Sequence, residues 1–132
     1  GNQPLIFSCK GMKVGVLICF DVEFPERVRE LARSDVELLV VPTALMEPYD
    51  IVSSALVPTR ALENGMFVAY SNRIGSEDNL RYVGRSCIVG PDGKDLARAG
   101  PDQESLIVGT IDVDTLKSVR AEVFYLRELG GL

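Results

Sequence analysis

The sequence contains no histidine, and this absence restricts the chemistry open to the protein. Ser-His-Asp and Cys-His nucleophile pairs, histidine-ligated zinc and histidine general bases all require an imidazole ring. A catalyst made from this chain must therefore take its general base from a carboxylate or an amine.

Cysteine is also scarce. The three cysteines are Cys9, Cys19 and Cys87, and no two of them form a C-x-x-C pair. An odd number without that spacing argues against a disulfide framework and against a thiolate metal cage. We therefore expect a reducing, cytoplasmic compartment and no metal site.

The charge and length favour a small globular unit. The 132 residues carry 14 Lys+Arg against 19 Asp+Glu, a formal net charge of −5, and 46% of them are hydrophobic. The acidic balance gives no electrostatic footprint for nucleic acid. No apolar run approaches the roughly 18 residues of a membrane span. These observations predict one soluble domain, or part of one, that acts on a small molecule rather than on nucleic acid or a membrane.

The first half of the chain has the pattern of an α/β fold. One helix is expected from Pro25, which begins a one-sided apolar stripe. Another is expected over 51–64, where Pro58 either kinks the helix or marks where two pieces join, and Gly65 ends it. The order strand-helix-strand-helix-strand is the signature of right-handed crossovers. Three apolar runs without polar alternation predict strands buried on both faces of a parallel sheet, at 13–19, 36–41 and 66–72.

The second half predicts antiparallel structure. The turn cluster Gly-Pro-Asp-Gly at 90–93 lies between apolar segments at 81–89 and 94–99, which predicts a hairpin. One more strand is expected over 105–111, followed by a short helix capped by Asp112. Only two good helical segments are available to cover three buried parallel strands. We therefore expect the chain to be the back half of a larger domain.

Cys19 stands where an α/β sheet binds its ligands. Ligands bind outside the carboxyl ends of the strands, and Cys19 ends the first predicted strand. The N-terminus of the helix that starts near Pro25 would favour a thiolate there. From position alone, a cysteine at a buried strand end is more often a small core residue than a nucleophile.

Several separated motifs resemble the carbon–nitrogen hydrolase (nitrilase) superfamily, and a set of motifs in the right order is far harder to obtain by chance than one. The resemblance implies an α-β-β-α sandwich, of which residues 1–132 are the C-terminal half, and pairing into a homodimer or higher homo-oligomer. The motifs are Gly-Met-Lys-Val-Gly-Val-Leu-Ile-Cys-Phe-Asp-Val-Glu-Phe-Pro-Glu at 11–26, Val-Pro-Thr-Ala at 41–44, Arg-Ala-Leu-Glu-Asn at 60–64, Asn72, Tyr-Val-Gly-Arg-Ser at 82–86 and the turn at 90–93.

This resemblance implies that Cys19 is the nucleophile, that it forms a thioester-type intermediate, and that no metal or organic cofactor takes part. The backbone N–H of Phe20 would help to hold the oxyanion. In family members a glutamate general base, a lysine and a second glutamate all precede the cysteine, in the portion that would lie before Gly1. Lys10 and Lys13 are too close to Cys19 to be that lysine. We therefore expect the 132-residue chain alone to be inactive.

Other residues divide between site and scaffold. Asp21 is expected to fix the turn by accepting backbone N–H bonds. Arg60 and Glu63 lie three apart on a helical face, which favours a buried or half-buried ion pair over ligand contact. Thr43 and Ala44 follow the second strand at the same edge as Cys19, where they either line the pocket or form an ordinary loop.

Val22 and Glu23 are the positions from which substrate can be inferred. In the family, these positions lie near the far end of the substrate, and relatives that bind carboxylate-bearing N-carbamoyl amino acids place arginines there. Glu23 would instead repel a carboxylate and favour an ammonium group, or else it is a solvated carboxylate at a helix start. The run Asp-Val-Glu-Phe-Pro-Glu resembles that of ω-amino-amide amidases such as 5-aminopentanamidase and of related stereoselective amidases.

The leading hypothesis is therefore hydrolysis of a small aliphatic amide, with or without an ω-amino group, to a carboxylic acid and ammonia. Hydrolysis of N-carbamoyl amines with the same machinery is a neighbouring alternative. A third is a non-catalytic fragment or pseudo-enzyme that serves as a binding or assembly module.

Overall fold

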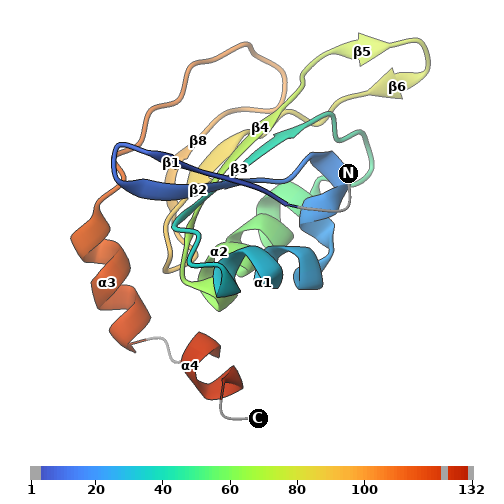
Figure 1. The fold of residues 1–132 in the computed structure, drawn as a ribbon. Helices are drawn as coiled ribbons and strands as arrows, with labels where there is room; N and C mark the ends of the chain where they lie inside the picture. Colours follow the sequence, from blue (N-terminus) through green and yellow to red (C-terminus); the bar gives the residue numbers. More distant parts are fainter. Residues whose placement is uncertain (1–3, 123–124, 131–132) are drawn as a thin grey trace.

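The fold is built on one mixed sheet of six strands (Figure 1). The strands are Leu5–Cys9 (β1), Met12–Val16 (β2), Leu38–Thr43 (β3), Phe67–Asn72 (β4), Cys87–Val89 (β7) and Asp95–Arg98 (β8). They stand in the order β1-β2-β3-β4-β7-β8, in which β2, β3 and β4 are parallel and the other pairings are antiparallel. The computed structural model describes residues 4–122 and 125–130. The predicted α/β class and the parallel order of the first three predicted strands are confirmed.

Both predicted helical regions between the parallel strands are found. Pro25 occupies the first turn of its helix, where a missing N–H costs nothing, and Gly65 ends the second in a left-handed conformation with φ of 54°. Pro58 stands where a π-helical turn gives way to α-helix, so it marks a junction. The helices are Cys19–Glu23 (η1, a 3-10 helix), Pro25–Arg33 (α1), Val52–Leu56 (η2, the π-helix), Val57–Asn64 (α2), Val113–Glu122 (α3) and Tyr125–Leu129 (α4). Among the residues described, no helix is long and apolar enough to cross a membrane.

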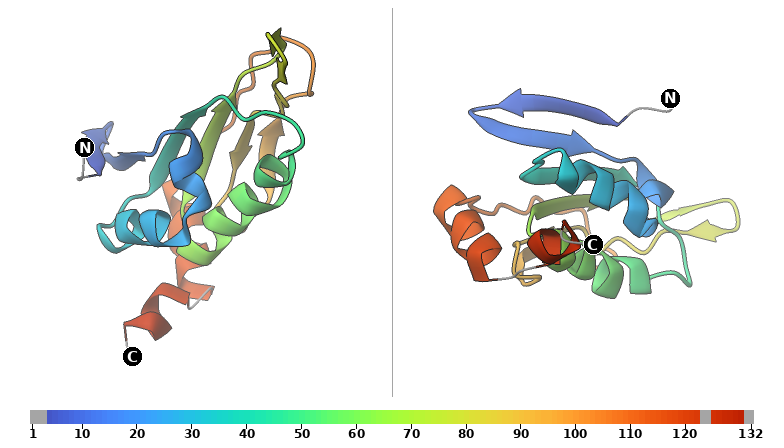
Figure 2. Two further views of the ribbon diagram at one scale, coloured as in Figure 1. Left: turned by 90° about the vertical axis from the view of Figure 1, so that its right-hand side faces the viewer. Right: turned by 60° about the horizontal axis from the view of Figure 1, so that its bottom comes forward.

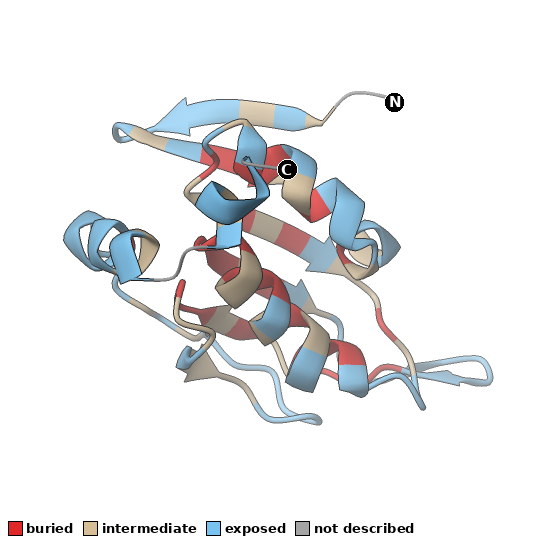
Figure 3. Ribbon diagram, turned by 90° about the horizontal axis from the view of Figure 1, so that it is seen from below, coloured by how far each residue is buried: buried red, intermediate tan, exposed pale blue. Residues whose placement is uncertain are grey.

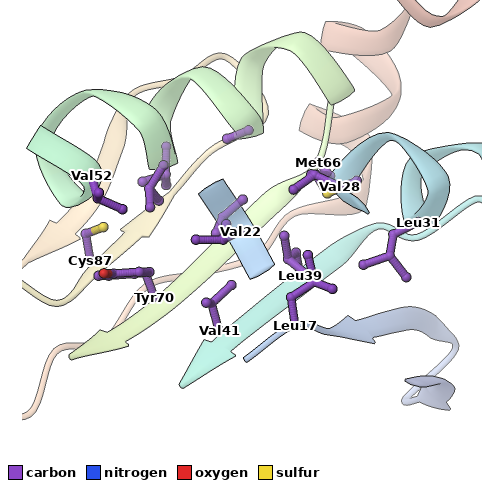
Figure 4. Packing of buried hydrophobic residues seen from close by; sticks show 14 of the residues in the cluster. Leu17, Val22, Val28, Leu31, Leu39, Val41, Val52, Met66, Tyr70 and Cys87 are labelled. Atoms are coloured by element: carbon purple, nitrogen blue, oxygen red, sulfur yellow. The ribbon is translucent and has the colours of Figure 1, made fainter. Parts of the chain in front are cut away.

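The hydrophobic core lies between the sheet and helices α1 and α2, which cover the same face (Figures 2 and 3). Figure 4 shows Leu39 and Val41 of β3 gathered with Val28 and Leu31 of α1, and all four side chains are fully buried. Gly15 of β2 lies directly beneath α1: a Cβ atom at this position would stand only 3.2 Å from Leu31 Cδ2 of that helix. The absence of a side chain at Gly15 therefore allows α1 to pack closely on the sheet.

The opposite face of the sheet is apolar but only partly covered. Side chains that alternate with the core-facing ones, such as Val16, Leu38, Val40 and Ala69, have intermediate exposure. The prediction that these strands are buried on both faces is therefore only partly confirmed on this face, where Val14 and Phe67 are buried but the residues above are not. Helices α1 and α2 both pack against the other face.

Two further predictions need correction, and both concern strand pairing. The predicted strand at 13–19 ends at Val16, since the backbone leaves the sheet before Cys19. The strand expected over 105–111 is not formed, and Leu106 and Val108 are 90% and 78% exposed. A strand is defined by a neighbour that pairs with its N–H and C=O groups, and the apolar pattern alone does not supply one.

The hairpin predicted around residues 90–93 is confirmed as β7 and β8, although both strands are shorter than expected. A second hairpin, Ser76–Glu77 (β5) with Leu80–Arg81 (β6), was not predicted and projects from the sheet (Figure 1). The Asp112 cap is also confirmed, since its carboxylate accepts hydrogen bonds from the N–H groups of Asp114 at 3.0 Å and Thr115 at 3.3 Å.

The close approach of α1 to β2 predicts that Gly15→Val will destabilise the fold. The added side chain must displace Leu31 and Val36, whose nearest atoms both stand 3.2 Å from a Cβ at this position. Overpacking of this kind costs about 1–3 kcal/mol in the free energy of unfolding. Urea unfolding followed by circular dichroism measures it, with Gly100→Ala as the control because its Cβ would meet nothing within 4 Å. Equal stability of the two variants would contradict this packing.

Candidate active site

Cys19 lies just beyond the carboxyl end of β2. The Leu17 N–H still donates to the Val40 carbonyl at 3.2 Å, so the chain stays on the sheet up to that residue. Ile18 is extended, and Cys19 then adopts a left-handed φ of 52° as the first residue of η1. This conformation costs a non-glycine residue on the order of 1–3 kcal/mol and persists only where the surroundings impose it. The thiol is thus held, half-buried, on a sharp turn at the edge of the sheet.

The carboxylate of Asp21 closes this turn. It accepts a hydrogen bond from the Ile18 N–H at 3.4 Å, and the Asp21 N–H donates to the Ile18 carbonyl at 3.2 Å. This contact is of the kind expected for Asp21. Cys19 and Phe20 begin the helix, and the first N–H groups of a helix have no acceptor in a preceding turn. These N–H groups are therefore suited to bind an anion or a carbonyl oxygen.

Arg60 of α2 reaches the other end of η1. Its Nε and Nη2 atoms donate to the carbonyl oxygens of Val22 at 3.2 Å and Glu23 at 2.8 Å. Its Nη1 atom forms the expected ion pair with Glu63 Oε1 at 3.0 Å, and the Arg60 side chain is only 8% exposed. The pair is therefore part of the support of the Cys19 turn as well as of helix packing.

Val22 and Glu23 lie differently on η1. The side chain of Val22 is buried within the core (Figure 4), so this position is that of a packing residue and does not fit the substrate contact expected for it. Glu23 is half-buried, and burial raises the pKa of its carboxyl group. Within the described residues, no hydrogen bond or ion pair reaches the Glu23 carboxylate. A partly desolvated carboxylate without a counter-charge favours a cationic ligand.

Thr43 and Ala44 lie at the same edge of the sheet, at the end of β3 and directly after it. Tyr70 of β4 is paired with Val41, on the face of the sheet that η1 covers, and its phenol is 2% exposed. Burial raises the pKa of Tyr70 to about 12, with smaller contributions from the charges of Cys19 and Glu23. Thr43 lies near enough to act in the opposite direction and lower this pKa, but no described residue has the geometry of a hydrogen bond to Tyr70 Oη.

Sequence reasoning did not single out Tyr70 or the contacts of Asn72. An aromatic residue in an apolar strand is typical of a hydrophobic core. Nothing in the neighbouring sequence indicates whether its hydroxyl group has a hydrogen-bond partner. The Asn72 side chain accepts from the Leu45 N–H at 2.8 Å and donates to the Gly84 carbonyl at 2.8 Å, and its backbone N–H donates to Ser86 Oγ at 2.9 Å. It therefore joins three segments at the edge that carries Cys19.

The remaining cysteines differ in environment. Cys9 is exposed and Cys87 is fully buried, where burial raises the pKa of its thiol to about 11. Over residues 4–122 and 125–130, no group of three or more His, Cys, Asp or Glu side chains is arranged to hold a metal ion.

Comparison with known proteins gives consistent matches. The family model for carbon-nitrogen hydrolases matches residues 1–121. A Pseudomonas protegens protein described as "Hydrolase in pqqF 5'region" is 48% identical, over 95% of this chain and 43% of its own length. An (R)-stereoselective amidase of a Pseudomonas species is 38% identical, over 97% of this chain and 47% of its own. The solved NitN amidase of Nesterenkonia sp. AN1 has a TM-score of 0.80 and 42% identity, over 92% of this chain and 48% of the amidase.

Two further structures of the Nesterenkonia amidase concern its ligands. One variant shows the Michael addition of acrylamide at the active-site cysteine, and another is in complex with butyramide. The present chain spans about half the length of the curated relatives that it matches.

The burial of Cys87 predicts that its thiol resists alkylation. The thiolate is the reactive form, and a pKa of about 11 leaves about one thiol in a thousand ionised at pH 8. Iodoacetamide treatment at pH 8, read by peptide mass spectrometry, should label the exposed Cys9 at least about 100 times faster than Cys87. Labelling of Cys87 should rise as the pH approaches 11 or when urea is added. Equal labelling of both at pH 8 would show that Cys87 is not buried.

Proposed function

The chain belongs to the carbon–nitrogen hydrolase family, and from this premise we propose that Cys19 is the nucleophile of an amidase acting on small aliphatic amides. One observation carries the proposal: Cys19 is the cysteine that the fold holds in a left-handed turn at the carboxyl edge of the parallel strands. The acrylamide adduct at the active-site cysteine of the Nesterenkonia amidase supports it. The butyramide complex of the same amidase supports the substrate class.

The reaction follows from a thiol at this position. The Cys19 thiolate attacks the amide carbon, and the oxygen takes up negative charge beside the Phe20 N–H at the start of η1. The C–N bond then breaks, and the nitrogen leaves as ammonia after it receives a proton. Water attacks the resulting thioester, which gives the carboxylic acid and returns the thiol.

The proton transfers require a base, and we propose that it lies outside these residues. No histidine is available, and the Asp21 carboxylate is occupied by the Ile18 N–H. The glutamate and lysine that the family uses would come from sequence that precedes Gly1, so this chain would be the C-terminal half of the domain. Its length of about half that of its relatives supports this assignment. We also propose that the whole protein is a homodimer or a higher homo-oligomer.

For the substrate, we propose an amide that carries an ω-amino group. The support is the partly desolvated carboxylate of Glu23, four residues from Cys19, which has no partner among the described residues. An ammonium group would gain a partner there, whereas a carboxylate would be repelled. The same carboxylate also suits an N-carbamoyl diamine, which keeps N-carbamoyl-amine hydrolysis as a second candidate. The products distinguish the two, since only the second releases carbon dioxide and an amine.

The natural gene product that contains this chain should release ammonia from a short aliphatic amide, and Cys19→Ala should abolish this release. The loss should be at least about 1000-fold because the bond-forming atom is removed. Cys9→Ala is the control, since that cysteine is exposed on β1, and its activity should be unchanged. The 132-residue chain alone should show no turnover. Full activity of the Cys19→Ala protein would refute the proposal, and binding without hydrolysis would favour a pseudo-enzyme.

Glu23→Gln should discriminate between charged and uncharged substrates. We expect kcat/KM for an ω-amino amide to fall at least about tenfold, because a partly buried charge pair is lost, while an alkyl amide of the same length changes little. Steady-state kinetics with both substrates give the comparison. If kcat/KM falls equally for both substrates, Glu23 has a structural role and does not bind the ammonium group of the substrate.

A further inference from the structure

The turn that carries Cys19 has little stability of its own. η1 contains only five residues of 3-10 helix, and helices of this length do not persist without tertiary contacts. Its first residue has a left-handed φ although it is not glycine. The position of the thiol therefore depends on what holds η1 at each end.

At its start, η1 is held by local bonds. Leu17 is bonded to β3, and the Asp21 carboxylate accepts the Ile18 N–H. These bonds fix the chain before Cys19. They do not reach the carbonyl groups of the last turn of the helix.

At its end, η1 is held by the burial of Val22 in the core and by hydrogen bonds from one side chain of α2. The last carbonyl groups of a helix lack intrahelical donors, and here the carbonyls of Val22 and Glu23 both accept from the Arg60 guanidinium, at 3.2 and 2.8 Å. Arg60 belongs to α2, and it lies 38 and 37 positions after Val22 and Glu23 in the sequence. Its positive charge also suits the negative end of a helix.

The guanidinium itself is fixed. Its remaining nitrogen, Nη1, donates to Glu63 Oε1 at 3.0 Å, so all three guanidinium nitrogens have an acceptor. Residue Arg60 is only 7% exposed, so the planar group does not rotate towards water. A lysine at this position would keep the charge for Glu63, but a single ammonium cannot match the fork that reaches both carbonyls.

We propose that Arg60 is a positioning residue for Cys19: by holding the carbonyls of Val22 and Glu23, it fixes the turn on which the thiol stands. The same contacts fix the backbone that carries the Glu23 side chain. The inference builds on the proposed role of Cys19 and deepens it. The competing interpretation is that Arg60 and Glu63 form an ion pair that stabilises α2 and has no effect on the thiol.

Three variants of the natural gene product separate these interpretations. Arg60→Lys keeps the charge and loses the fork, while Glu63→Gln breaks the ion pair and leaves the guanidinium on the two carbonyls. Arg29→Lys is the matched control, because the Arg29 guanidinium also donates to a backbone carbonyl of α2, that of Glu63 at 2.9 Å. Among the described residues, no hydrogen bond joins that guanidinium to η1. Each variant is assayed for melting temperature, for kcat and KM, and for the alkylation rate of Cys19 relative to Cys9.

We expect Arg60→Lys to lower kcat and the Cys19-to-Cys9 alkylation ratio at least about tenfold, since small misplacements of a reacting group can cost about 100-fold in rate. Glu63→Gln should lower the melting temperature and keep the alkylation ratio within about twofold. Arg29→Lys should also keep that ratio. Equal ratios in Arg60→Lys and in the unmodified protein would overturn the inference.

If Arg60→Lys does not fold, Glu63→Gln provides the test. An alkylation ratio of Cys19 to Cys9 that stays unchanged while the melting temperature falls supports the positioning role of Arg60. A ratio that falls together with the melting temperature means that Arg60 acts only through the ion pair, which overturns the inference. The alkylation assay needs no amide substrate. A changed ratio in a protein that hydrolyses no amide would therefore refute the proposed function while leaving the positioning role of Arg60 intact.

Discussion

The site depends on one constraint, the sharp turn between β2 and η1 that puts Cys19 in a left-handed conformation. A non-glycine residue holds such a conformation only when the structure around it offers no alternative. Here the chain is bonded to β3 before the turn, and Arg60 holds it after the turn. This turn brings together a half-buried thiol and the first N–H groups of η1, which have no acceptor within the helix.

The sheet supplies the rigid base for this turn. Parallel strands β2, β3 and β4 end at one edge, so residues that are far apart in sequence meet there. Thr43 ends β3, and Asn72 ends β4 and binds two neighbouring segments, one through Leu45 and the other through Gly84 and Ser86. Because one face of the sheet is packed tightly against α1 and α2, the edge has a fixed geometry. The fold thus positions the proposed nucleophile and part of its surroundings, whereas the proton-transfer groups are proposed to come from elsewhere.

The features that were predictable from the sequence have local causes. Apolar runs specify the parallel strands, Pro25 starts α1, Gly65 ends α2 and Asp112 caps α3, and each of these signals acts within a few residues. Cys19 was proposed as a site residue because of the neighbouring motifs rather than because of its own position.

The features that were missed depend on distant partners. The left-handed turn at Cys19 has no glycine to announce it, and the hydrogen bonds of Arg60 join residues 37 and 38 positions apart. The Tyr70 phenol has no hydrogen-bond partner among the described residues, and no local pattern in the sequence predicts this. The segment at 105–111 has the pattern of a strand, but a pattern does not supply the neighbour that a ladder requires.

The central claim, that the Cys19 sulfur forms a covalent bond to the substrate carbonyl, can be tested by trapping the intermediate. The natural gene product is mixed with butyramide, quenched in acid within a turnover and analysed by intact-protein and peptide mass spectrometry. The account predicts a mass increase equal to one butyryl group replacing a proton, located on Cys19 and removed by hydroxylamine, as a thioester requires. Amide hydrolysis with no acyl adduct, or with the acyl group on another residue, would contradict it.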